Sequence, residues 1–289
     1  MQRCSGRLVL MGVWLAIGAT AACGDDDDDV TDTGPIDTGA TDLGIDSGPP
    51  PADTGPRDAS EPDDSGPPSL WYCVGDVEWP TATATSATFT ISFIEILFGV
   101  SDAPPVDGLS VSACEGDSAC AEPLATGTTD AMGEVELTIP LTPQGFRGFF
   151  RLTKDGFVSG SLFLLPPIVR SFVWWHGPWA VFRSTSFAEM ASADGRPLDP
   201  TKGSVVVLSS DCNYLGGTTS AITTELDMTL DGAEPDAVLE HASIFYVVDP
   251  GTVTLVATRR ATGEVVGTTE WVVVAGEISQ GVLGPTPME

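Results

Sequence analysis

The sequence has very little positive charge. Its 289 residues include 12 Lys and Arg against 41 Asp and Glu, which gives a formal net charge of −29, and Lys154 and Lys202 are its only lysines. A protein that binds nucleic acid or an anionic lipid surface by electrostatics needs a basic face, because the phosphates are negative. The composition therefore excludes nucleic acid as a partner and argues against binding to lipid headgroups through charge.

Histidine and the motifs of catalysis and metal binding are also scarce. The two histidines, His176 and His241, lie far apart in the sequence, and neither has a second His or a Cys at metal-ligand spacing. The sequence contains no Gly-x-Ser-x-Gly nucleophile turn and no Gly-rich phosphate loop. Asp-Thr-Gly, the triplet of aspartic proteases, occurs in low-complexity sequence without flanking strands. We predict no enzymatic activity, no cofactor and no metal site.

No apolar run is long enough to cross a bilayer, but a short one lies near the N-terminus. Residues 8–17 are apolar and follow Arg3 and Arg7, as in a secretory signal peptide. The following Thr20-Ala21-Ala22-Cys23 resembles the lipobox of bacterial lipoproteins, although Thr20 replaces the usual aliphatic residue. The resemblance implies cleavage after residue 22 and lipidation of Cys23. The alternative is an ordinary signal peptide in which Cys23 has no role.

Residues 24–68 form a polar segment without aromatic residues. The segment carries fourteen acidic side chains and one Arg, with crude repeats such as Asp32-Thr33-Gly34 and Asp53-Thr54-Gly55. Such a composition buries too little apolar surface to offset the entropy of ordering, so we expect a disordered linker. Its 45 residues would reach on the order of 150 Å if extended. We interpret it as a spacer between the membrane anchor and the folded part.

Four cysteines remain after the signal peptide and the lipobox. Cys73, Cys114, Cys120 and Cys212 are an even number in an exported domain, which indicates two disulfides and allows three pairings. The polar loop between Cys114 and Cys120 is short enough for a bridge to close. We therefore predict Cys114–Cys120 and, by elimination, Cys73–Cys212.

From residue 69 onward, strand patterns recur about every ten residues with turn residues between them. Residues 88–98 and 134–140 alternate apolar and polar side chains, and residues 203–212 are a continuous apolar run. Between them, Ser186 and Glu189 fit a helix capping box. We predict an all-β fold with two tandem Greek-key sandwiches. The segments are a signal (1–22), lipidated Cys and linker (23–68), first sandwich (69–183), helical joint (184–202) and second sandwich (203–289).

Residues 104–165 resemble the carboxypeptidase regulatory-like (transthyretin-like) β-sandwich family. The resemblance rests on Val106-Asp107-Gly108, Asp130-Ala131-Met132-Gly133, Gly145-Phe146 and Lys154-Asp155-Gly156-Phe157, each at a turn beside a strand. The segment Pro250 to Leu255 is similar to a second, more degenerate copy. The layout resembles tandem lipoproteins of this family in myxobacteria. The matched residues are turn and core positions, so the resemblance implies an architecture and no catalytic residue.

The one candidate binding feature is an aromatic cluster in residues 172–182. Trp174, Trp175 and Trp179 could stack on sugar rings if they are exposed on the surface of the sandwich. The alternative is that these aromatic residues fill the contact between the two sandwiches. The cluster therefore raises a glycan-binding hypothesis that depends on whether the indoles are exposed.

The N-terminal features suggest where the protein acts. Gly24 after the lipidated cysteine lacks the Asp that retains many Gram-negative lipoproteins in the inner membrane, and the acidic run 25–29 resembles surface-export tags. We therefore expect a protein that is lipid-anchored in the outer membrane, at the cell surface, and binds a glycan or a protein. The alternative is an accessory subunit of an envelope complex that faces the periplasm.

Overall fold

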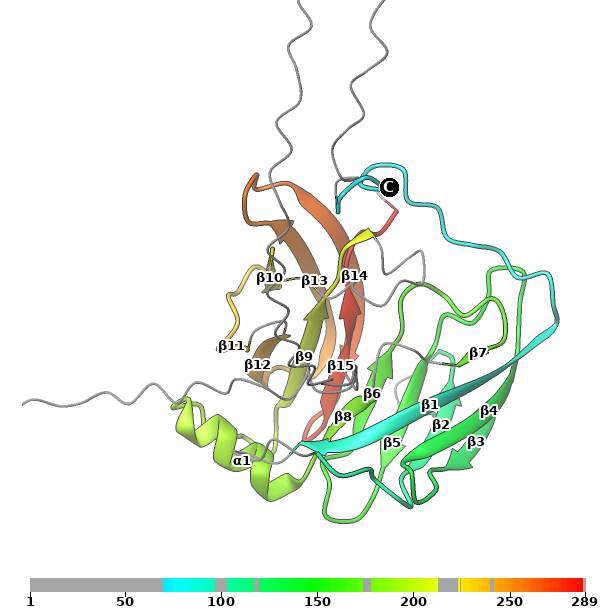
Figure 1. Cartoon of the computed structure of the whole chain (residues 1–289). Helices are drawn as coiled ribbons and strands as arrows, with labels where there is room; N and C mark the ends of the chain where they lie inside the picture. Colours follow the sequence, from blue (N-terminus) through cyan, green and yellow to red (C-terminus); the bar gives the residue numbers. More distant parts are fainter. Residues whose placement is uncertain are drawn as a thin grey trace, which may run out of the picture. The chain divides into compact units, whose positions relative to one another are not determined.

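The computed structural model describes residues 70–96, 103–116, 120–173, 178–212, 223, 225–239 and 242–287. These residues form fifteen strands and one helix (Figure 1). The predicted all-β class is confirmed. The signal sequence, Cys23 and the linker lie outside the described residues.

The largest sheet has eight strands and contains strands from both predicted sandwiches. Its order is β11-β12-β9-β15-β6-β5-β2-β3, with β15 parallel to both of its neighbours. The strands are β2 (Ser110–Cys114), β3 (Ala125–Thr128), β5 (Phe149–Thr153), β6 (Gly160–Phe163), β9 (Gly203–Ser209), β11 (Ala237–Leu239), β12 (Ala242–Val248) and β15 (Ile278–Leu283).

Two smaller sheets complete the fold. In the first, which we call the β1 sheet, β1 pairs with β4 in antiparallel and with β7 and β8 in parallel orientation. In the second, the β13 sheet, the order is β10-β13-β14. The strands are β1 (Ser86–Ile96), β4 (Glu134–Pro140), β7 (Phe172–Val173), β8 (Trp179–Phe182), β10 (Leu226–Leu230), β13 (Gly251–Arg259) and β14 (Val265–Val273).

Sequence and structure agree best where strands alternate and turns have a defined chemistry. Alternate residues of β1 and β4 are buried along their whole paired length. The turn before β4 depends on Asp130, whose Oδ1 accepts hydrogen bonds from the N–H groups of Met132 (2.9 Å) and Glu134 (3.0 Å). Gly133 has φ +75°, and a Cβ there would lie 2.4 Å from the Phe93 carbonyl oxygen. Only glycine fits this position.

The two smaller sheets pack on opposite faces of the eight-stranded sheet. The register aligns Leu162 of β6 with Gln280 of β15 and Val206 of β9, so these side chains share one face, which we call face I. Leu162 packs in the core under the β1 sheet. Val207 points to the opposite face, face II, where it packs in the core under the β13 sheet.

Helix α1 (Ser184–Ala193) also packs on face I, beside the β1 sheet. Its buried residues Phe187 and Ala191 contact Ile244 and Tyr246 of β12. The predicted capping box at Ser186 is wrong, because the N-cap is Arg183 and makes no side-chain capping bond.

The first turn of α1 is stabilised from outside the helix. The N–H of Ser184 donates to the Gly156 carbonyl (3.1 Å). This carbonyl from another loop supplies the hydrogen-bond acceptor that a capping side chain would otherwise provide.

Strand β15 joins the two halves of the sheet, and the strand analysis of the sequence missed it. It lies between β6 of the predicted first sandwich and β9 of the predicted second one, and all six of its residues are buried. The described residues accordingly belong to one compact unit. The two sandwiches share a sheet in addition to being joined by α1.

Candidate functional site

The aromatic cluster of residues 172–182 divides between described and undescribed residues. Trp174 and Trp175 lie outside the described residues, so their glycan-stacking role stays a prediction. Trp179 lies on β8, is 4% exposed and packs in the core under the β1 sheet. An indole buried to this extent has no free ring face for a sugar, so the structure does not support the predicted stacking role of Trp179.

The other described aromatic residues of this cluster also point inward. Phe172 stacks on Phe89 with ring centroids 6.0 Å apart. The ring centroids of Phe182 and Phe187 of α1 lie 5.1 Å apart, and Phe182 belongs to the core between α1 and face I. Strand β8 thus fills two adjacent cores, which agrees with the packing alternative for this part of the cluster.

Both predicted disulfides are confirmed. Cys114 bonds to Cys120 beside the end of β2, and Cys73 bonds to Cys212 across 139 residues. The second bridge connects the start of the folded region with the segment that follows β9.

The residues that follow the linker are fixed to the β13-sheet side of the protein. Trp71 is 7% exposed and packs in the core under the β13 sheet. Its Nε1–H donates to Glu225 (2.8 Å), and the guanidinium of Arg259 lies 5.4 Å from the centre of the ring. Together with the Cys73–Cys212 disulfide, these contacts form a junction at which the chain from the linker meets the fold.

An ion pair between a buried carboxylate and a half-exposed arginine connects β1 with the start of α1. Glu95 is 5% exposed, and its Oε2 accepts a hydrogen bond from Nη2 of Arg183 (3.0 Å), while Nε of Arg183 contacts Oε1. The same guanidinium lies 5.0 Å from the centre of the Phe157 ring. Bidentate pairing satisfies the carboxylate, so this pair is a structural contact.

A second pair, Arg151 and Glu277, lies on face II near the start of β15. The two side chains are 21% and 14% exposed. Burial raises the pKa of the Glu277 carboxyl group, and the positive charge of Arg151 and its hydrogen bond oppose this shift in part. The pair joins β5 of the first half to the strand that connects the halves.

A third polar cluster lies where α1 ends over β12. The Tyr246 hydroxyl donates to Asp194 (2.7 Å), and the Tyr246 N–H donates to Asp236 (2.8 Å). Asp236 also forms an ion pair with Arg196 (2.9 Å). Burial and the neighbouring carboxylates raise the pKa of Tyr246, so the phenol stays protonated and acts as a hydrogen-bond donor.

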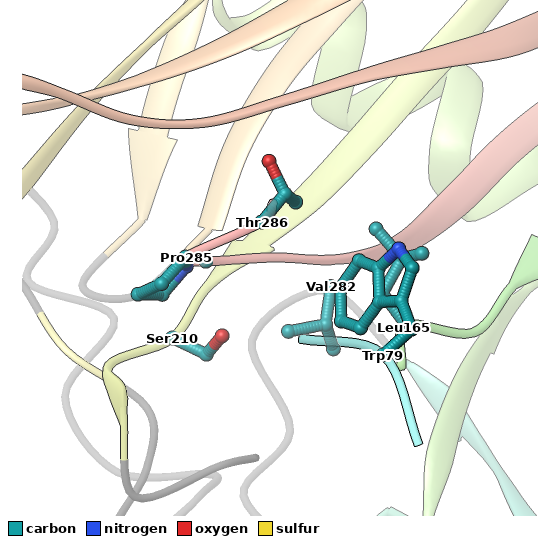
Figure 2. A pocket seen from close by; sticks show the side chains of 7 residues that line it. Trp79, Leu165, Ser210, Val282, Pro285 and Thr286 are labelled. Atoms are coloured by element: carbon teal, nitrogen blue, oxygen red, sulfur yellow. The ribbon is translucent and has the colours of Figure 1, made fainter. Parts of the chain in front are cut away.

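Two hollows in the described part of the protein are small. They have volumes of about 190 and 210 Å³ even when solvent-open space is counted, below the ~300–1,000 Å³ of typical ligand pockets. Figure 2 shows the first, which is lined by Trp79, Leu165, Ser210, Val282 and residues 284–286.

The described residues also lack the features of a metal site and of a membrane-spanning helix. Within the described ranges, no group of three or more His, Cys, Asp or Glu side chains is placed to hold a metal ion. None of the helical structure in these ranges has the length and apolar character of a membrane span.

The most exposed apolar side chain on any described strand belongs to an edge. β11 ends the eight-stranded sheet, and Val238 and Leu239 are 62% and 40% exposed. Sequence analysis did not identify this strand. Its short Ala-Val-Leu run lacks the alternation that marks the longer strands, although Pro235 before it is typical of an edge.

The chain matches no protein-family model and no curated protein. It is similar to solved structures at low identity. The shaft pilin SpaA of Lactobacillus rhamnosus GG is 12% identical, with a TM-score of 0.23, over 72% of this chain and all of the pilin chain. The Bacillus anthracis TIE protein is 10% identical, with a TM-score of 0.22, over 69% of this chain and 34% of its own. Scores this low carry no argument about function, so the assignments below rest on residues of this chain.

Proposed function

We propose that this protein is a lipid-anchored lipoprotein that acts outside the cytoplasm as a non-enzymatic binding or structural module. The observation that carries the proposal is the pair of disulfides in the folded region. Disulfides form and persist in oxidising compartments. The four cysteines outside the signal and lipobox are all paired, which supports folding after export.

The position of the Cys73–Cys212 bridge fits a tethered protein. The linker meets the fold at residues 70–76, where the disulfide and the Trp71 contacts hold the chain. Cys23 lies 47 residues before Leu70 in the sequence. An anchor at Cys23, a polar spacer and a fixed junction would present the β-sheets at a distance from the membrane.

Lipidation is tested by labelling cells with an alkyne analogue of palmitate. We expect label on the wild-type protein and none on Cys23→Ala. Cys4→Ala is the matched control, because it removes a cysteine from the same signal and should keep the label. Label on Cys23→Ala, or absence of label on the wild type, would contradict the proposed anchor.

The side of the membrane is tested by treating intact cells with proteinase K and probing for residues 70–289, with lysed cells as the control. Cleavage in the linker of intact cells would support display at the cell surface. Protection until lysis would contradict surface display and favour an envelope subunit that faces the periplasm.

A further inference from the structure

The edges of the β13 sheet and of the eight-stranded sheet differ in the contacts that they make. Strand β14 is followed by the C-terminal segment, where the Thr286 N–H donates to the Val266 carbonyl (3.1 Å). At the edge strand β10, the Arg260 side chain bonds the Leu226 carbonyl (3.4 Å) and Asp227 (2.8 Å). The contacts to Val266 and Leu226 occupy backbone carbonyls that could otherwise pair with another strand.

At one end of the eight-stranded sheet, β4 packs on the face of β3. A Cβ at Gly127 of β3 would lie 2.6 Å from the Val135 side chain, which shows how closely β4 packs over this end. Both edges of the β13 sheet thus have contacts with a connection or an ion pair, and β4 packs over one end of the eight-stranded sheet.

β11, at the other end, differs in chemistry. It pairs with β12 through three residues, Ala237 to Leu239, and presents Val238 and Leu239 to solvent. Native edge strands commonly carry lysine or another inward charge that prevents pairing. β11 contains neither, and its exposed side chains are those that favour a strand.

Charge limits what can pair with this edge. The neighbouring sequence positions Glu234, Asp236 and Glu240 are all acidic, and the whole chain has a net charge of −29. A second copy of this chain would bring like charges together at its β11, and the acidic linker would do the same. A basic segment would instead be attracted.

We propose that β11 is a docking edge for an extended partner segment in which apolar residues alternate with Lys or Arg. The segment adds a strand to the eight-stranded sheet, its backbone pairs with β11, and its apolar side chains pack beside Val238 on face II, while its basic side chains lie on face I. This names a partner class for the binding module proposed above and rests on that proposal. The binding experiment reports on β11 alone, whereas labelling and proteolysis report on the anchor, so the two can fail separately.

The test uses the exported chain and an acetylated, amidated octapeptide of alternating Val and Lys. Calorimetry measures affinity, and amide hydrogen exchange measures protection of residues 236–239. We expect binding together with severalfold slower exchange in this segment. A Val–Lys peptide with alternate N-methylated amides keeps the charge but loses backbone donors, and it should bind at least tenfold more weakly.

Two variants separate strand pairing from general attraction between opposite charges. Val238→Lys places a charge on the edge and should weaken binding at least tenfold. Val265→Lys makes the same change at a residue of β14 that is 44% exposed, and it should change affinity less than about twofold. Equal losses in both variants, equal binding of the N-methylated peptide, or unchanged exchange at residues 236–239 would each overturn the proposal.

Discussion

The two halves of the eight-stranded sheet differ in how many of their faces are covered. Strands β2, β3, β5 and β6 have the β1 sheet on face I, and several of their polar side chains on face II remain accessible to solvent. Strands β9 and β12 are covered on both faces, by α1 on face I and the β13 sheet on face II. One continuous sheet therefore combines a half-buried half with a fully buried half.

The sequences of the strands reflect this difference. β2 reads Ser-Val-Ser-Ala-Cys, with its two serines on face II. β9 reads Gly-Ser-Val-Val-Val-Leu-Ser, and almost every residue is buried. Strands with one solvated face alternate, and strands covered on both faces are continuously apolar. A strand that distant segments cover on both faces therefore shows no alternation of apolar and polar residues in its own sequence.

The largest effect should come from removing the disulfide of the covered half. We expect Cys73→Ser with Cys212→Ser to lower the free energy of unfolding by up to about 5 kcal/mol, because the bridge closes a loop of more than a hundred residues. Cys114→Ser with Cys120→Ser should cost about 2 kcal/mol, because its loop is short. Denaturant unfolding measures the free energy of unfolding of both double variants. Equal losses of stability would contradict the expected difference.

Removing the indole that bridges the halves should be nearly as costly. Trp271 of β14 is 1% exposed and stacks on Phe163 of β6, with ring centroids 5.2 Å apart. It also lies directly over β15, where a Cβ at Gly281 would lie 2.8 Å from the ring. Trp271→Ala should lower stability by about 3–5 kcal/mol.

The halves should still unfold in one transition in the Trp271→Ala variant, because they share β15. Calorimetry can test this, since two separate transitions would show that the halves are independent units. Tyr72→Ala, which removes an aromatic side chain that is 59% exposed, is the control and should change stability by less than about 0.5 kcal/mol.

A smaller effect should distinguish covered from solvated positions in the same sheet. Val207→Ala removes buried methyl groups from the core under the β13 sheet and should cost about 2 kcal/mol. Ser112→Ala, on the accessible part of face II, should change stability by less than about 0.5 kcal/mol. Similar losses at both positions in urea unfolding would show that the first half is also covered on face II.

The smallest effect should be a pH dependence at the boundary between the halves. Burial raises the pKa of Glu277 in the folded state above its usual value of 4.5. The folded protein therefore holds more protons than the unfolded one between these two pKa values, and this residue makes stability fall as the pH rises through that window.

Glu277→Gln removes this titration. Relative to the wild type, the variant should be more stable at pH 7 than at pH 4, with a free energy of unfolding higher by less than about 1 kcal/mol. Urea unfolding at both pH values measures the difference. Asp155→Asn, a change of an exposed carboxylate, is the control and should not show it, and an opposite trend for Glu277→Gln would contradict the role of burial.

Sequence analysis succeeded where the controlling interactions are local. The alternation of residues 134–140 predicted β4 with its observed bounds, and the Asp130–Gly133 turn was identified from its residues. The two disulfides followed from cysteine number and one short loop. The predicted start of the helix was wrong because a carbonyl from another loop, and not Ser186, bonds its first N–H.

The sequence by itself determined the all-β class, the main strands and the cysteine pairing, because side-chain periodicity and turn chemistry act over a few residues. Only the tertiary structure decided that the two predicted sandwiches share one sheet, that Trp179 is buried and that β11 is an edge. β15 pairs with β6, which precedes it by more than a hundred residues. Hydrogen bonds between strands so distant depend on which layers cover each face, and no local pattern in Ile278–Leu283 specifies its neighbours.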